Sequence, residues 1–135
     1  MKLIGSVFVF SIIAPACGGG DGSSIGNSGV PTGVEIVDVT PDEAQALCEY
    51  IIGLLEQPER QVDCGNGQVV TVGINPENVD SSIAKCVMQL EMVPGSCTAT
   101  VGDFETCFEV SASASDAQIC SPDLPPSCSP VAPCI

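Results

Sequence analysis

The clearest run of regularly spaced apolar positions lies between Thr40 and Pro58. Apolar residues recur there every three or four positions, the spacing of one helical face; they are Ala44, Leu47, Cys48, Ile51 and Leu55. In Thr40-Pro41-Asp42-Glu43 the threonine suits the cap, the proline suits the first helical position, and the glutamate completes a capping box. We therefore predict an amphipathic helix that begins after Thr40 and stops at Pro58.

Two further segments show the same periodicity. Asn75-Pro76-Glu77 repeats the cap-then-proline pattern, and the helix predicted after it extends to about Met92. Thr100 begins a third predicted helix, whose Ser/Ala-rich end after Val110 is expected to fray. The apolar face of the second helix holds Val79, Ile83, Cys86, Val87 and Leu90, and that of the third holds Val101, Phe104, Cys107 and Phe108.

The other segments carry strand, turn and loop signals. Residues 60–64 and 68–72 flank Gly65-Asn66-Gly67, which predicts a β-hairpin because Asn-Gly tolerates the positive φ of a tight turn. Residues 34–39 are expected to form either a short strand or an extended arm packed on the domain. Prolines recur after Cys120 and disfavour regular structure there. The predicted fold is mainly α: a small disulfide-rich domain over 34–135, with about three helices, a β-hairpin and an irregular Cys/Pro-rich tail.

The N-terminal region has the pattern of an export signal. Lys2 precedes the apolar run Leu3–Ile13, and the small residues Ala14 and Ala16 follow it. The run is shorter than the roughly 20 residues that a membrane-spanning helix needs. We predict a signal peptide over 1–16 and, because the next stretch is rich in Gly and Ser, a flexible tether over 17–33.

The chain has nine cysteines, and cleavage after Ala16 would make Cys17 the first residue. The eight cysteines that remain in the exported domain predict four disulfides. These cysteines are Cys48, Cys64, Cys86, Cys97, Cys107, Cys120, Cys128 and Cys134. Zinc sites use pairs of ligands two to four residues apart and often include histidine. This chain has no such cysteine pair and no histidine, so no metal site is predicted. Eight cysteines allow 105 pairings, and the sequence leaves them open.

Cys17 is the predicted attachment point. Ala14-Pro15-Ala16-Cys17 resembles a bacterial lipobox, with Ala14 where leucine is usual and an uncommon Pro15. Lipoproteins commonly place a Gly/Ser tether after the lipidated cysteine, as Gly18-Gly19-Gly20 does here. We predict a lipid anchor on Cys17, which would be firm because several acyl chains contribute. The alternative is a freely secreted protein.

The acidic composition limits the partners. The chain has 17 Asp and Glu against 3 Lys and Arg, with a net charge of −14. Such a surface repels phosphate backbones, so a nucleic-acid partner is not expected. It also repels anionic lipid headgroups, so membrane attachment is expected only through the anchor. No protein or small-molecule partner is identified from the sequence.

No catalytic residue or cofactor site is predicted. Without histidine the chain lacks Ser-His and Cys-His nucleophile systems. The carboxylate pairs Asp42/Glu43 and Asp103/Glu105 lie in the first turns of predicted helices, where they favour the helix dipole for structural reasons. The chain also lacks tryptophan, the usual platform of a sugar site. We therefore expect a non-enzymatic protein.

The overall pattern resembles the small cysteine-rich lipoproteins that myxobacteria encode. The residues that carry this resemblance are Cys17-Gly18-Gly19-Gly20, Cys64-Gly65-Asn66-Gly67, Cys86-Val87, Ser96–Gly102 with Phe104 and Cys107, and Pro126-Ser127-Cys128 to Cys134. The resemblance implies an outer-membrane or cell-surface lipoprotein, and otherwise a periplasmic or extracellular one, without a known activity. The function expected is structural or binding, and the alternative is a secreted carrier or inhibitor that binds an apolar ligand or a protein partner.

Overall fold

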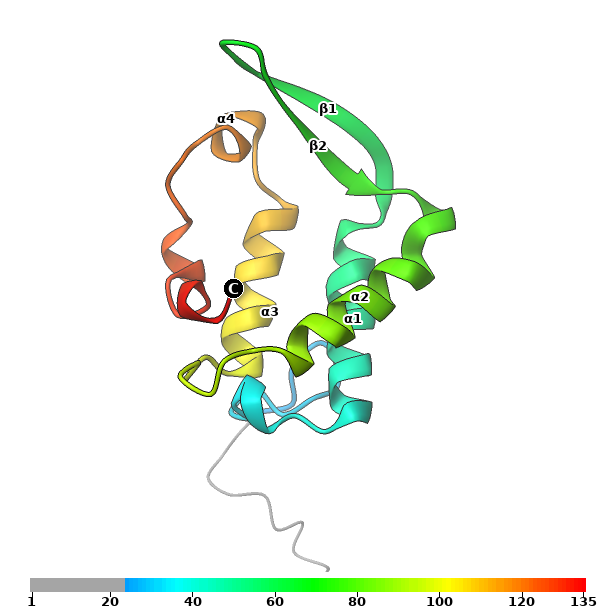
Figure 1. Ribbon diagram of the computed structural model, residues 1–135, viewed down its shortest axis with the longest axis vertical. Coiled ribbons are helices and arrows are strands. Elements are labelled where there is room, and N and C mark those ends of the chain that lie inside the picture. The colour runs from blue at the N-terminus through cyan, green and yellow to red at the C-terminus, as the bar shows by residue number, and fades with distance from the viewer. Residues whose placement is uncertain (1–23) are drawn as a thin grey trace, which may run out of the picture.

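The computed structural model describes residues 24–135, in which three long helices pack together and a β-hairpin projects from one end of them (Figure 1). The elements are α1 (Pro41–Leu55), β1 (Gln57–Gly65), β2 (Gln68–Ile74), α2 (Val79–Glu91), α3 (Val101–Ala112) and the single turn α4 (Asp116–Ile119). Short 3-10 turns lie at Ile36–Asp38, Pro76–Asn78, Pro126–Cys128 and Ala132–Cys134. The predicted fold class, mainly α with a hairpin, is confirmed.

Both α1 and α3 begin with a reciprocal cap, which was predicted for α1 and is found at α3 as well. At α1 the Thr40 hydroxyl accepts from the Glu43 amide at 3.3 Å, and the Glu43 carboxylate accepts from the Thr40 amide at 2.8 Å. Thr100 and Asp103 form the same pair at 3.3 and 2.9 Å. These bonds satisfy amides that the first helical turn leaves without partners.

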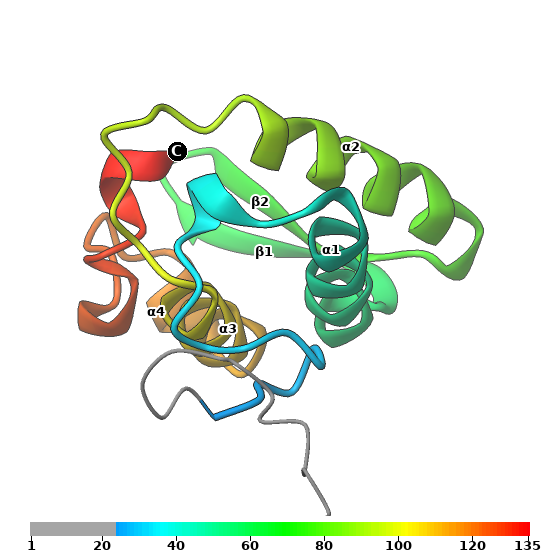
Figure 2. The same cartoon turned by 90° about the horizontal axis from the view of Figure 1, so that it is seen from below.

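The start of α2 differs from the prediction. Asn75 does not cap the helix; its side-chain oxygen accepts from the backbone amide of Glu59 in β1, at 3.1 Å. Because that side chain is used at the base of the hairpin, Pro76–Asn78 forms a 3-10 turn and α2 begins only at Val79. α2 lies across the outside of α1 (Figure 2), and Leu90 is its one buried residue.

The hairpin is confirmed and is longer than predicted. β1 and β2 pair antiparallel with Val62 opposite Val70, and the pairing reaches Gln57 and Ile74 at the base. The turn residues Gly65, Asn66 and Gly67 all have positive φ, at 83°, 54° and 77°. This backbone conformation explains the glycine–asparagine–glycine sequence at the tip.

Residues 24–33 correct the expected end of the tether. Val30 is only 2% exposed and belongs to the core, and the Gly26 amide donates to the Val30 carbonyl at 2.8 Å. The amides of Asn27 and Ser28 donate to the carboxylate of Glu105 at 3.1 and 2.8 Å. Composition alone suggested flexibility, but one buried valine and two amide–carboxylate bonds fix this segment on α3. The signal peptide and residues 17–23 lie outside the described residues.

Residues 34–39 form the extended arm, one of the two structures expected for them. The arm runs beside the segment before α3: the Ile36 amide donates to the Ala99 carbonyl at 3.0 Å, and the Val101 amide donates to the Val34 carbonyl at 2.8 Å. A 3-10 turn interrupts it at Ile36–Asp38. The tail after Cys120 is likewise not wholly irregular, because its prolines fit the first positions of two 3-10 turns.

Four disulfides are present, as predicted, and the structure supplies their pairing: Cys48–Cys86, Cys64–Cys120, Cys97–Cys134 and Cys107–Cys128. The first joins α1 to α2, and the second joins the hairpin to the end of α4. The other two fix the tail to α3 and to the loop before it. Cys17 lies outside the described residues, so its lipidation stays a prediction. Within 24–135, no helix has the length and apolar character to cross a bilayer.

Candidate ligand-binding pocket

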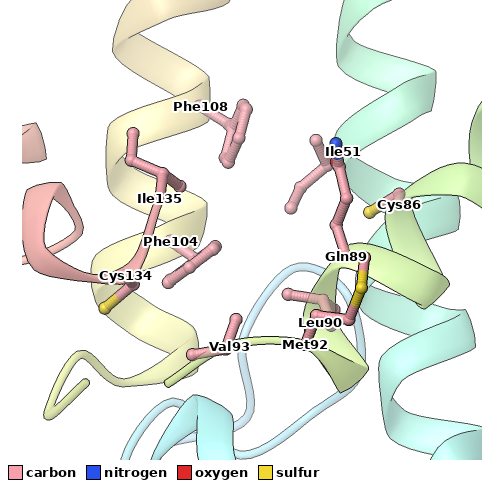
Figure 3. Close-up of a pocket in the computed structure, with 10 residues that line it drawn as sticks. All are labelled: Ile51, Cys86, Gln89, Leu90, Met92, Val93, Phe104, Phe108, Cys134 and Ile135. Carbon is pink, nitrogen blue, oxygen red and sulfur yellow. The ribbon is translucent and has the colours of Figure 1, made fainter. Parts of the chain in front are cut away.

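An apolar pocket of about 340 Å³ lies among the three long helices and the end of the chain (Figure 3). The α3 side of the pocket is formed by two aromatic rings, Phe104 and Phe108, whose centroids are 6.2 Å apart. Ile51 of α1 and Leu90 of α2 face these rings from the other side. The remaining lining residues are Cys86, Gln89, Met92, Val93, Cys134 and Ile135.

Two disulfides frame the pocket. Cys86 bonds to Cys48 and holds α2 against α1, while Cys134 bonds to Cys97 and holds the end of the chain beside α3. Covalent links at opposite walls restrict how far the pocket can collapse or open. Small-molecule sites are usually preformed in this way and occupy roughly 300–1,000 Å³, so the volume lies at the small end of that range.

The lining of the pocket contrasts with the rest of the chain. Although the protein has 17 acidic residues, no acidic or basic side chain lines the pocket, and Gln89 is the one polar side chain. Exposed apolar residues stand at its edge: Met92 is 74% exposed and Ile135 is 86% exposed. Such a surface suits an apolar ligand, and the flexible side chain of Met92 can adapt to different shapes.

A second hollow of about 320 Å³ lies further along α1 and α3, beneath the base of the hairpin. Leu55 comes from α1, Ser111 and Ala112 come from α3, and residues 71–74 of β2 cover it. Arg60 of β1 is the one charged side chain in the lining, and its guanidinium lies 2.8 Å from the carboxylate of Asp116. The two hollows therefore differ in polarity.

A polar cluster fastens the N-terminal segment to α1 and α3. The Glu109 carboxylate accepts from the Tyr50 hydroxyl and, at 2.7 Å, from the side-chain amide of Asn27. The hydrogen bond to Glu109 raises the pKa of Tyr50, and the hydrogen bonds from Tyr50 and Asn27 lower the pKa of Glu109. Nearby, Glu105 is 4% exposed and leaves no room for a side chain at Gly26, whose Cβ would lie 2.5 Å from its carboxylate. These contacts explain the polar cluster as the attachment of the N-terminal segment to α1 and α3.

The residues of the pocket were not singled out from the sequence as a site. Phe104 and Phe108 were correctly placed on the apolar face of α3, where they counted only as core residues. The one signal in the sequence that could have indicated the site is the occurrence of the apolar residues Met92, Val93 and Ile135 beside loop and tail cysteines. Pairing of Cys97 with Cys134 was needed to bring these segments together. Among residues 24–135, no three His, Cys, Asp or Glu side chains are grouped to hold a metal ion.

No protein-family model matches the chain, and no curated protein or solved structure matches it. The pocket must therefore be interpreted from its own geometry and chemistry.

Proposed function

We propose that this protein is an exported, non-enzymatic binding protein of the cell envelope, and that its domain holds an apolar ligand in the pocket between α1, α2 and α3. The observation that carries the proposal is a pocket without charged side chains in a strongly acidic chain, framed by two disulfides. The absence of histidine from the sequence supports a role without nucleophilic catalysis.

The four disulfides make the protein a small disulfide-rich domain, which is typical of an oxidising extracellular or periplasmic compartment. We propose the more specific address from the sequence: a signal peptide over 1–16, a lipid on Cys17 and a place at the outer membrane or cell surface. The resemblance to myxobacterial cysteine-rich lipoproteins supports this address. Membrane attachment through Cys17 would keep the domain where envelope lipids and other apolar molecules are abundant.

Binding can be tested with Nile red, a neutral apolar dye whose fluorescence rises in an apolar site. We expect saturable fluorescence enhancement with the oxidised protein. Met92→Glu should reduce it, because the carboxylate would stand at the edge of the pocket. The matched control is Met88→Glu: Met88 is also exposed on the α2 side of the molecule, at 54%, but does not line the pocket. Absence of saturable binding, or equal loss in the two variants, would contradict the proposal.

The anchor is tested by intact mass spectrometry of the protein from membranes of its own cells. We expect a lipid-sized mass increment on a chain that begins at Cys17, and its loss in Cys17→Ser. Recovery of an unmodified Cys17 peptide from the culture medium would show free secretion instead, and would leave the pocket proposal unaffected.

A further inference from the structure

We propose that the ligand is a long single-chain amphiphile with an anionic head group, with its chain in the apolar pocket and its head at Arg60. This inference rests on the proposed function, since it assigns a ligand class to the same pocket. Its basis is the position of the second hollow relative to the first and the difference in polarity between them.

Both hollows are lined by residues of α1 and of α3, and the strip between these helices that holds the two hollows is called the groove. Ile51 lines the first and Leu55 the second, and these residues lie one turn apart on α1. On α3, Phe108 lines the first and Ala112 the second, again one turn apart. At 1.5 Å per residue, four residues advance about 6 Å along a helix axis. The two hollows are therefore neighbours along the helices, and the proposal places one extended chain across both.

Different elements cover the two parts of this groove. Residues of α2 line the first hollow, whereas residues of β2 line the second. In Figure 1, α2 crosses α1 and the hairpin stands at the far end of α1 and α3. The disulfide Cys48–Cys86 fastens α2 to α1, and Cys64–Cys120 joins β1, the partner strand of β2, to the end of α4. A ligand that occupied both hollows would be elongated along the helix axes, which suits an extended chain better than a compact ring system.

The polarity along the groove gives the ligand its direction. The first hollow has no charged side chain in its lining, whereas the second has Arg60 together with the polar side chains Gln57, Thr71 and Ser111. Arg60 and Lys85 are the two basic residues of the described part of the chain. One of the two thus lies at the polar end of an otherwise apolar groove.

Arg60 is able to exchange its present partner for a ligand carboxylate. It forms an ion pair with Asp116 in which the two side chains are 46% and 63% exposed, and an ion pair so accessible to water contributes little to stability. The guanidinium has five N–H donors in a planar fork that matches a carboxylate, so it can bind a ligand while still facing Asp116. The net charge of −14 repels anions at a distance, but at physiological salt that repulsion is screened beyond about 8 Å.

The test compares three probes of equal chain length: palmitate, the corresponding primary alcohol and the corresponding primary amine, each below its aggregation concentration. Their affinities are measured by displacement of Nile red and by calorimetry. We expect palmitate to bind about tenfold more tightly than the alcohol, which corresponds to one charge-assisted hydrogen-bonded contact. Equal binding of palmitate and the alcohol, or tighter binding of the amine, would overturn the assignment of an anionic head.

Variants then locate the head group. Arg60→Gln should weaken palmitate binding about tenfold and leave the alcohol unchanged. Lys85→Gln changes the net charge equally but does not line either hollow, so it should leave both probes unchanged. Equal losses in the two variants would show a general charge effect and contradict a site at Arg60. Near-ultraviolet circular dichroism confirms that each variant keeps its fold.

Asp116→Asn distinguishes the effect of the Arg60 guanidinium itself from the effect of its ion pair with Asp116. This variant loses the salt bridge but keeps Arg60, so palmitate binding should be equal to the wild type or tighter. A tenfold loss in Asp116→Asn would mean that the ion pair acts by holding the hairpin in place, and would contradict direct recognition by Arg60. Saturable Nile red binding without any effect of Arg60 would overturn this inference while leaving the proposed function intact.

Discussion

The helical body and the C-terminal tail are stabilised in different ways. In the body, α1 and α3 have reciprocal caps and bury apolar faces against each other and α2. The tail after Ala112 has only single helical turns, yet it contributes Cys128, Val131 and Cys134 to the core. Local sequence patterns can form the body, whereas the tail depends on three disulfides, two of them to buried cysteines. The comparison shows that the pocket, which needs both regions, depends on both kinds of stabilisation.

The largest effect is expected from breaking the core of the body. Leu47 of α1 is completely buried, so Leu47→Ala should lower the free energy of unfolding by about 2–5 kcal/mol through lost burial and an added cavity. Denaturant unfolding of the oxidised protein measures this loss. The control is Gln45→Ala on the exposed side of α1, which should change stability by less than about 0.5 kcal/mol. A loss below 1 kcal/mol at Leu47 would mean that the disulfides, rather than burial, determine the stability of the body.

Breaking the tail should have a somewhat smaller effect on stability and a selective effect on the pocket. The paired substitution Cys97→Ser with Cys134→Ser removes the disulfide that holds the end of the chain and should cost about 2–4 kcal/mol. Because Cys134 and Ile135 line the pocket, Nile red affinity should fall as well. The Cys64–Cys120 disulfide provides a contrast, since neither of its cysteines lines the pocket, and its removal should leave Nile red affinity close to that of the wild type.

The helix caps are expected to contribute less. Thr40→Ala and Thr100→Ala each remove a side-chain acceptor from the first turn of a helix, and each should cost about 1 kcal/mol in thermal or denaturant unfolding. The similar geometry of the two boxes predicts similar losses. Thr40→Ser and Thr100→Ser retain the hydroxyl and should recover most of the stability. A negligible loss at Thr100 alone would indicate that the neighbouring disulfides fix the start of α3 without the cap.

The smallest expected effect is a pH dependence at the polar cluster. The pKa of Glu109 is below its ordinary value of 4.5 in the folded protein, so its stabilising contribution is complete above that value and is lost as pH falls through the lowered pKa. Tyr50 has a pKa raised above 10.0, so its contribution is complete below that value and is lost as pH rises through the raised pKa. Unfolding of the wild type and of Tyr50→Phe at several pH values should show a smaller acid-side loss in the variant. Identical pH profiles of the wild type and Tyr50→Phe would exclude the polar cluster as the cause of the acid-side loss of stability.

The sequence predicts the helical body well because its signals are local. Caps at Thr40 and Thr100, apolar faces at helical spacing and the glycine–asparagine turn all lie within a few residues of the structures they form. The predicted start of α2 was wrong because the Asn75 side chain accepts a hydrogen bond from an amide 16 residues away instead of capping the next turn. The end of the predicted flexible tether was wrong for a similar reason. Residues 27 and 28 are held by Glu105, which lies nearly 80 positions further along the chain.

The pocket was not predictable for the same reason. Its walls come from four separate parts of the chain, and their arrangement depends on a disulfide pairing that spacing alone does not determine. The number of disulfides follows from cysteine count and export, whereas the partners follow only from the three-dimensional fold. Aromatic and aliphatic residues of a core and of a binding site also look alike in sequence, so only the hollow between them distinguishes the two.

If Cys17 carries a lipid, the attachment of Asn27 and Ser28 to Glu105 would determine how the domain is presented on the membrane. With a lipid on Cys17, only the seven residue steps from Cys17 to Ser24 separate the anchor from the fixed part of the chain, a reach of at most about 25 Å. The fixed segment lies on the side of α1 and α3 opposite α2 (Figure 2). A domain held this closely would keep one face toward the bilayer, and the α2 side, where the pocket lies, would point outward. The clamp would thus set both the height and the orientation of the binding site.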